Sequence, residues 1–275
     1  MTVRPPGFLA ADRPLSQARV AILGVPLERT VSFRGGPAAG PAAIRAASWS
    51  VEEYSVLSNR HLSQVGVCDL GDVDCDRPLG QILADVQAQV GRLLKDGRKA
   101  VLLGGEHTLT LGAVRGVKGA LGGVQLLAMD AHSDLRDTYR GERVSHATVL
   151  RRASEVAHRL AIVGARSLFG GEVGEPFFAG PEEVPELLSP DAPVWLSLDL
   201  DALDPALCPG VTNPEPGGLS YREVIELLRR LRPLPVVGMD IVELAPPFDP
   251  SGVSAICAAK LVVEAICGLW AAAGS

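Results

Sequence analysis

The sequence predicts an α/β protein built on a parallel sheet with helical crossovers. Short apolar runs, rich in β-branched residues, alternate along the chain with segments whose apolar residues recur at helical spacing. Runs this short and this apolar fit strands that are covered on both faces. No repeat, low-complexity tract or linker-like change of composition interrupts the 275 residues. We therefore expect one domain.

Composition excludes several classes of function. The formal net charge of −6 gives no basic surface for nucleic acid, and no stretch reaches the roughly 18 consecutive apolar residues of a membrane-spanning helix. We expect a soluble, cytoplasmic protein without nucleic-acid or membrane partners. The five cysteines form no CxxC pair, which argues against a thiolate zinc site and a disulfide framework. They are Cys68, Cys75, Cys208, Cys257 and Cys267.

Six apolar runs are predicted to be strands of the sheet. Each is short, and most end in glycine or in acidic residues. In chain order they are Arg19–Gly24, Lys99–Gly105, Val124–Asp130, Leu160–Gly164, Val194–Asp201 and Val236–Leu244.

Three segments between and after these strands are predicted to be helices. Apolar residues recur at helical spacing from Leu79 to Leu94, and Lys95–Gly97 supplies a basic end and a stop. Ser220, followed three residues later by a glutamate, forms a capping-box pattern at the start of a second helix. The segment Ser254–Trp270 is apolar on most faces, so we expect a helix that is buried in the core or at a subunit contact.

Polar residues collect at the ends of three predicted strands, where parallel sheets bind their ligands. The segments are "GGEHTLT" (104–110), "DAHSD" (130–134) and "SLDLDALDP" (197–205). If the second and third segments are extended, alternate residues share one face. That places Asp130, His132 and Asp134 together, and likewise Asp199 and Asp201. The third aspartate of the last segment, at position 204, is expected to shape the loop instead.

With His107, these residues make an inventory of four carboxylates and two imidazoles. Burial of so many unpaired carboxylates would cost several kcal/mol each, which favours a metal site over a structural role. Oxygen-rich ligation with two histidines and no thiolate suits a divalent ion such as Mn²⁺ better than a structural zinc. Six ligands are many for one ion, so two ions bridged by carboxylates are plausible, and such a pair generates hydroxide near neutral pH.

These three segments resemble the signatures of the ureohydrolase family of arginases and agmatinases, which are GG(D/E)H, DAHxD and SxDxDxxDP. The resemblance extends from "GVPLERTVSFRGGPAAGPAAIRAAS" (24–48) through "DIVELAPPFDPSGVSA" (240–255). It implies one three-layer α/β domain over residues 1–275, with a central, mostly parallel sheet flanked by helices. It also implies two Mn²⁺ ions per subunit.

Carried over residue by residue, the resemblance assigns ligands to both ions. One Mn²⁺ would be held by His107, Asp130, Asp134 and Asp199. The other would be held by Asp130, His132, Asp199 and Asp201, so that Asp130 and Asp199 bridge.

The implied reaction is attack of a metal-bridging hydroxide on the guanidinium carbon, which yields urea and an amine. His146 in "VSHATVLRR" matches the family's proton shuttle, and Glu243 in "DIVELAPP" matches its guanidinium-binding carboxylate. Together with Asp134 they form the predicted catalytic set.

The loop features favour agmatine as substrate, with urea and putrescine as products of a step in polyamine biosynthesis. The loop "LRDTYRGERVSH" is short, and Phe169 stands about where an arginase carboxylate is expected. "GGEH", with Glu106, and "APPFDPSGVSA" also resemble agmatinases. Asp137 and Glu142 are the predicted partners of the distal amine. N1-aminopropylagmatine, arginine and guanidinobutyrate stay open, the last with Arg140 as a cationic partner.

Two further classes of function remain. Two-metal carboxylate sites also hydrolyse phosphate esters, but no Gly-rich phosphate loop or basic cluster supports that reading here. A non-catalytic assembly protein that retains the fold is disfavoured, because the presumed ligands, His146 and Glu243 are all intact. The family resemblance implies a small cationic guanidino substrate and a homotrimer or homohexamer.

Overall fold

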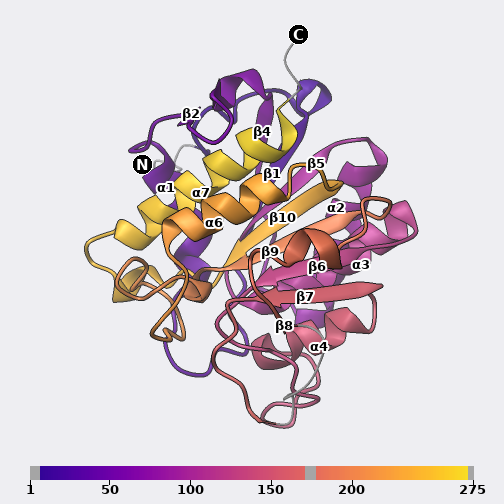
Figure 1. The fold of residues 1–275 in the computed structure, drawn as a ribbon, viewed down its shortest axis with the longest axis vertical. Coiled ribbons are helices and arrows are strands. Elements are labelled where there is room, and N and C mark those ends of the chain that lie inside the picture. The colour runs from indigo at the N-terminus through magenta and orange to yellow at the C-terminus, as the bar shows by residue number, and fades with distance from the viewer. Residues whose placement is uncertain (1–6, 171–177, 272–275) are drawn as a thin grey trace.

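An eight-stranded sheet crosses the computed structural model, which describes residues 7–170 and 178–271 (Figure 1). Its strand order is β4-β1-β5-β10-β9-β6-β7-β8, and every pairing among the described residues is parallel. The predicted parallel sheet is confirmed. Its strands are β1 (Val20–Val25), β4 (Val67–Asp72), β5 (Lys99–Gly104), β6 (Gln125–Met129), β7 (Arg159–Val163), β8 (Phe178–Ala179), β9 (Val194–Asp199) and β10 (Val236–Val242). A separate hairpin pairs β2 (Tyr54–Ser55) with β3 (Arg60–His61).

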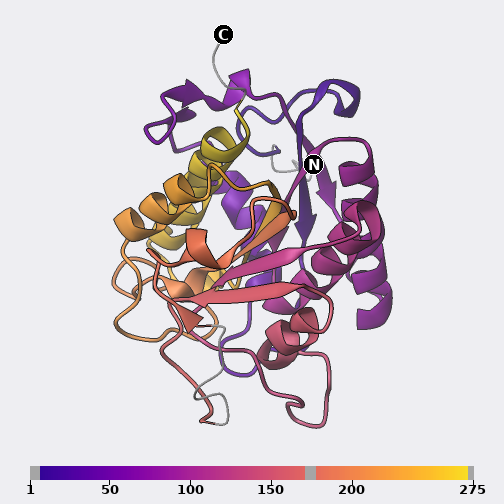
Figure 2. The same cartoon turned by 45° about the vertical axis from the view of Figure 1, so that its right-hand side comes forward.

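Helices cover both faces of the sheet, which gives the predicted three layers (Figures 1 and 2). The helices on one face are α1 (Gly40–Ser48), α5 (Val184–Leu187), α6 (Tyr221–Arg230) and α7 (Val253–Trp270). Those on the other face are α2 (Leu79–Lys95), α3 (Thr110–Leu121) and α4 (Val149–Ser154). The helices predicted from Leu79, after Ser220 and through Trp270 are α2, α6 and α7.

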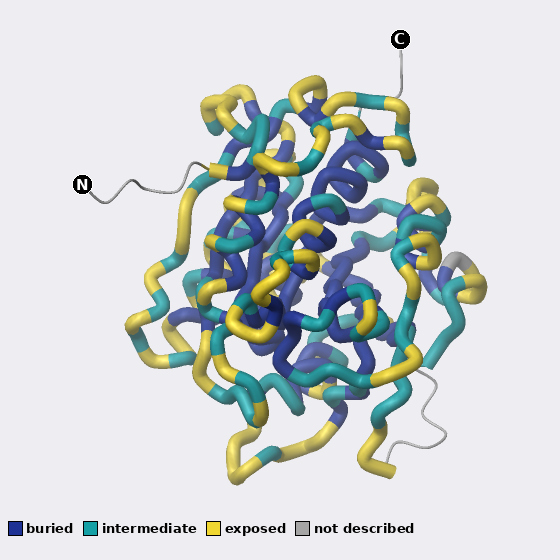
Figure 3. Tube along the Cα trace, turned by 90° about the vertical axis from the view of Figure 1, so that its left-hand side faces the viewer, coloured by how far each residue is buried: buried dark blue, intermediate teal, exposed yellow. Residues whose placement is uncertain are grey.

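The core lies on both sides of the sheet. All residues of β1, β9 and β10 are buried, which is why these strands are apolar without alternation. Helix α7 is long and apolar enough to cross a membrane, yet 72% of its residues are buried inside the protein, as is typical of a core helix. Figure 3 shows this buried interior surrounded by exposed loops. The prediction that the last helix is buried is confirmed.

Two predicted extended stretches end early. Strand β9 stops at Asp199, and residues 200–202 form a 3₁₀ turn that is capped by a hydrogen bond from the Asp201 N–H to Asp199 Oδ1 (2.8 Å). Asp134 has a positive φ of 49°, so residues 130–134 are not a continued strand either. The expectation that simple strand alternation aims these carboxylates is therefore wrong, because local turns bring them together.

A close approach in the sheet gives a stability prediction. Gly238 in β10 has no room for a side chain, since an added Cβ would lie 2.3 Å from the Trp195 ring and 2.6 Å from the Ala100 carbonyl oxygen. Gly238→Ala should lower the free energy of unfolding by about 1–3 kcal/mol or more, measured by urea denaturation. The control is Gly80→Ala at an exposed position of α2, where nothing lies within 4 Å and a gain of about 0.5–1 kcal/mol is expected. Equal stability of the two variants would contradict this account of the packing.

Candidate active site

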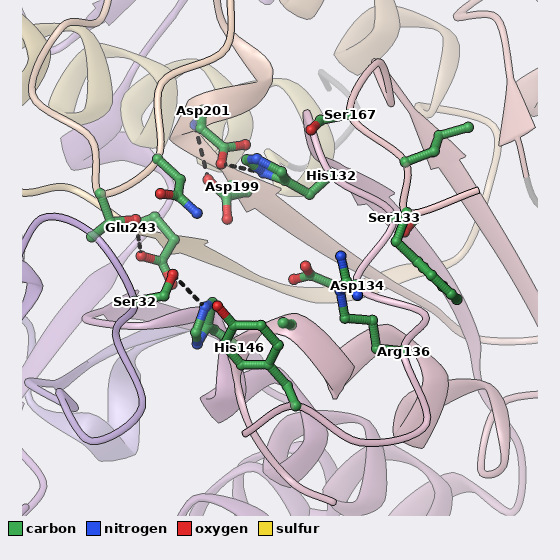
Figure 4. A pocket seen from close by; sticks show the side chains of 16 residues that line it. Ser32, His132, Ser133, Asp134, Arg136, His146, Ser167, Asp199, Asp201 and Glu243 are labelled. Atoms are coloured by element: carbon green, nitrogen blue, oxygen red, sulfur yellow. Dashed lines mark hydrogen bonds and ion pairs between the residues drawn. The ribbon is translucent and has the colours of Figure 1, made fainter. Parts of the chain in front are cut away.

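The strand order brings the predicted site residues to one edge of the sheet. Strands β5, β10, β9 and β6 are neighbours, and their carboxyl ends lead into His107, Glu243, Asp199 and Asp130. A pocket opens at this edge (Figure 4). Its lining includes Asp134, Asp199, Asp201, His132, His146 and Glu243.

His107 faces three carboxylates. Its Nδ1 atom lies 3.1 Å from Asp130 Oδ2, 3.2 Å from Asp134 Oδ2 and 3.4 Å from Asp199 Oδ2. These side chains are at most 11% exposed. His107 Nδ1 and Asp130 Oδ2 are buried without a hydrogen-bond partner. Buried polar atoms normally have partners, so this arrangement fits the binding of a cation between them.

A second group adjoins the first. His132 Nδ1 lies 2.8 Å from Asp201 Oδ2 and 3.6 Å from Asp130 Oδ1. Candidate ligand atoms lie within 4.8 Å of one another in two sets that share Asp130: His107, Asp130 and Asp199 in one, and Asp130, His132 and Asp201 in the other. The structure thus brings all six predicted ligands together around two neighbouring positions. The bridging roles of Asp130 and Asp199 both stay predictions.

The electrostatics of the cluster call for positive charge. Burial, followed by the charge of Asp201, raises the pKa of Asp199 well above its usual value. Burial and the charge of Asp130 raise the pKa of Asp134 to about 7. Although burial opposes it, contact with Asp130 and Asp201 raises the pKa of His132 to about 12. Without a metal these groups would hold protons instead, and the oxygen-rich donor set without thiolate fits a pair of divalent ions.

A buried hydrogen-bond chain orients His107. The Ser197 hydroxyl donates to Asp240 Oδ1 (2.5 Å), so its oxygen accepts from His107 Nε2–H (2.9 Å). The lone pair of Nδ1 is then left toward the carboxylates. Trp195 Nε1–H donates to Asp240 Oδ2 (2.6 Å). Such support is typical of metal-binding histidines, but Ser197 and Asp240 were not predicted as part of the site.

Glu243 is held rigidly at the pocket wall. Its Oε1 accepts from the His107 backbone N–H (2.5 Å), and its Oε2 accepts from the Thr212 hydroxyl. Burial raises its pKa to about 8. Glu243 also has a positive φ of 66°, which is costly for a residue with a side chain and is found mainly at functional sites. The structure therefore fixes this carboxylate where a cationic group in the pocket would meet it.

His146 lies on the pocket lining with both ring nitrogens in hydrogen-bond contact. Nδ1 is 3.0 Å from Thr30 Oγ1, and Nε2 is 3.1 Å from Ser32 Oγ (Figure 4 shows the latter contact). The ring centroids of His146 and Tyr139 lie 5.4 Å apart in an edge-to-face arrangement. Burial lowers the pKa of His146. A histidine held this way can exchange a proton with a group in the pocket.

The residues predicted to bind the distal amine lie elsewhere. Asp137 forms an ion pair with Arg152 (2.5 Å), its side chain is 72% exposed, and it does not line the pocket. Glu142 is also absent from the lining, and its backbone exchanges two hydrogen bonds with that of Tyr139. Phe169 does line the pocket mouth, where the Arg136 guanidinium lies 4.6 Å from its ring. The residues that follow, 171–177, lie outside the described part of the chain.

Comparison with known proteins places this geometry in a family. The model of the arginase family matches residues 18–175 and 180–268. The chain is 33% identical to an agmatinase of Halalkalibacterium halodurans, over 95% of this chain and 96% of that protein. It is also 33% identical to a guanidinobutyrase of Pseudomonas aeruginosa, over 90% and 86%. The crystal structure of agmatine ureohydrolase of Thermoplasma volcanium superposes with a TM-score of 0.88 at 31% identity, covering 97% and 95%.

The cluster gives a prediction for metal binding. Asp199→Asn removes a charged oxygen from the buried set and should lower the Mn²⁺ retained per chain, measured by elemental analysis after dialysis. Asp204→Asn makes the same chemical change five residues later. Asp204 accepts hydrogen bonds from the Ala206 and Gly217 backbones, outside the cluster. That control should keep its metal, and full retention by Asp199→Asn would show that the assigned ligands are wrong.

Proposed function

The chain belongs to the arginase family and is a hydrolase of that family, and on this premise we propose that it cleaves the guanidinium group of a small linear guanidino compound into urea and an amine. We propose two Mn²⁺ ions per subunit as cofactors. The observation that carries the proposal is the pair of ligand groups that share Asp130. Members of both groups line the same pocket as Glu243 and His146, namely Asp199 from one group, and His132 and Asp201 from the other. A homotrimer or homohexamer and a cytoplasmic location stay predictions.

The side chains divide the reaction between them. A bound metal pair would supply a water of lowered pKa as the nucleophile. Glu243 holds the planar cation, because each of its oxygens has a lone pair left beyond the contacts to His107 and Thr212. His146 delivers a proton from Nε2 to the leaving nitrogen, which is too basic to depart as an anion.

Agmatine is the substrate we propose first. Phe169 lines the pocket and stands about where an arginase would have a carboxylate. The "GGEH" segment also favours agmatine. The H. halodurans agmatinase is a relative over nearly its whole length.

One observation favours a second candidate, guanidinobutyrate. Among the described residues that line the pocket, Arg136 is the one arginine or lysine, whereas Arg140, the cationic partner expected from the sequence, does not line it. A guanidinium at this place would attract the carboxylate of guanidinobutyrate and repel the ammonium of agmatine. The guanidinobutyrase of P. aeruginosa is as similar to this chain as the H. halodurans agmatinase.

The test is urea release by the Mn²⁺-loaded protein from agmatine, guanidinobutyrate, N1-aminopropylagmatine and arginine. Agmatine should give the highest kcat/KM. Glu243→Gln should raise the KM for agmatine by about 10- to 100-fold, because a charge-assisted hydrogen bond to the substrate is lost. A preference for guanidinobutyrate would replace agmatine with the second candidate. No urea from any of the four would refute the proposed reaction.

A further inference from the structure

Glu106 is a fully buried carboxylate that belongs to neither ligand group. Its Oε2 accepts from the backbone N–H groups of Arg29 (2.5 Å) and Thr30 (2.7 Å). Its Oε1 accepts from the hydroxyls of Thr30 (2.8 Å) and Thr108 (2.6 Å). Four donors are directed at its two oxygens, so Glu106 acts as the acceptor in each of these contacts. The single hydroxyl proton of Thr30 is thereby directed to Glu106.

Thr30 Oγ1 then has only its two lone pairs left for His146. One accepts from the His146 backbone N–H (3.0 Å), and the other faces Nδ1 at 3.0 Å. Because Thr30 has no second proton to give, Nδ1 must be the donor in this contact. We propose that Thr30 and Glu106 are positioning residues that keep the proton of neutral His146 on Nδ1 and leave Nε2 as the atom that exchanges protons in the pocket.

The fold builds this arrangement from three distant segments. Thr30 lies in the loop after β1, Glu106 follows β5, and these strands pair in register from Val20 with Lys99 to Val25 with Gly104. His146 opens a 3₁₀ turn whose start is fixed by the capping box of Ser145 and Thr148. Rotating the ring by 180° would place a carbon against Thr30 Oγ1 and lose its hydrogen bond. The ring is therefore held in one orientation as well as one tautomer.

The inference rests on the proposed function for its chemical meaning. When the ring carries both protons, Nε2–H gives its proton to the leaving nitrogen as the carbon–nitrogen bond breaks and its electron pair goes to that nitrogen. The ring is left neutral, with Nδ1–H still bonded to Thr30. Ser32, 3.1 Å from Nε2, can then donate a hydrogen bond to the lone pair that the departing proton leaves on Nε2. A base held by a third group in this manner is the common logic of catalytic relays.

The test reads the tautomer directly by ¹H–¹⁵N NMR of the histidine rings in the full-length protein, loaded with Mg²⁺ because Mn²⁺ is paramagnetic. The chain has only five histidines, and a His146→Asn sample identifies the ring. Wild-type neutral His146 should carry its proton on Nδ1. Thr30→Val, which removes the hydroxyl at constant shape, should shift the proton toward Nε2. It should also lower kcat about tenfold or more with KM nearly unchanged, part of the ~10²–10⁴-fold that a positioned acid contributes.

Thr30→Ser keeps the hydroxyl and should restore both the Nδ1–H tautomer and most of the turnover. A wild-type spectrum with the proton on Nε2 would overturn the inference, and so would a Thr30→Val protein with unchanged tautomer and kcat. The wild-type spectrum decides even if Thr30→Val does not fold. It also decides whether or not urea is released, so failure of this inference and failure of the proposed function are told apart.

Discussion

Repulsion among buried carboxylates is the constraint on which the rest of this structure depends. Asp130, Asp134, Asp199 and Asp201 lie at one edge of the sheet with side chains at most 11% exposed, so water cannot screen them. The raised pKa values of Asp134, Asp199 and Asp201 show what these three carboxylates would do alone, which is to take up protons. This repulsion arises because the carboxyl ends of neighbouring parallel strands lie side by side. Two divalent cations are the solution that the donor set fits.

Three further buried acids lie outside this cluster, and two of them orient histidines of the site. Asp240 orients His107 through Ser197, and Glu106 orients His146 through Thr30. Glu243 is itself fixed by Thr212 and the His107 backbone, so that its remaining lone pairs meet the pocket. In each case hydroxyl or backbone donors satisfy the carboxylate, which lowers the cost of its burial. The acids of the site thus fall into two groups: the aspartates of the candidate metal cluster, and the acids whose hydrogen bonds fix the positions of side chains.

Much of the framework could be predicted from sequence, because apolar runs and helical spacing report burial directly. Strand β4 was not predicted, since its "VCDLGD" sequence is polar; its Asp69 pairs with Arg45 from α1. Helix α3 was not predicted either. Its glycines at 112 and 116 lie against α2, where an added Cβ would come within 2.7 Å of a carbonyl oxygen, so they serve close packing and not a turn.

The candidate site, too, could be predicted from sequence only in part. The candidate ligands stand in short motifs, so their residue types and spacing allowed them to be proposed from sequence. The contacts of Thr30 with His146 and of Ser197 with Asp240 join residues 116 and 43 positions apart, and only the folded chain shows them. The residue that binds the distal end of the substrate could not be predicted from sequence for the same reason. Asp137 lies close to the motif in sequence, yet it forms an ion pair with Arg152.

We propose that the carboxylate cluster holds two ions around a shared Asp130. Crystals of the Mn²⁺-loaded protein, measured at the manganese absorption edge, would locate the ions by anomalous scattering. We expect two peaks about 3.5–4 Å apart, one beside His107 and the other beside His132, with Asp130 between them. A single peak, or manganese bound away from these residues, would contradict the account.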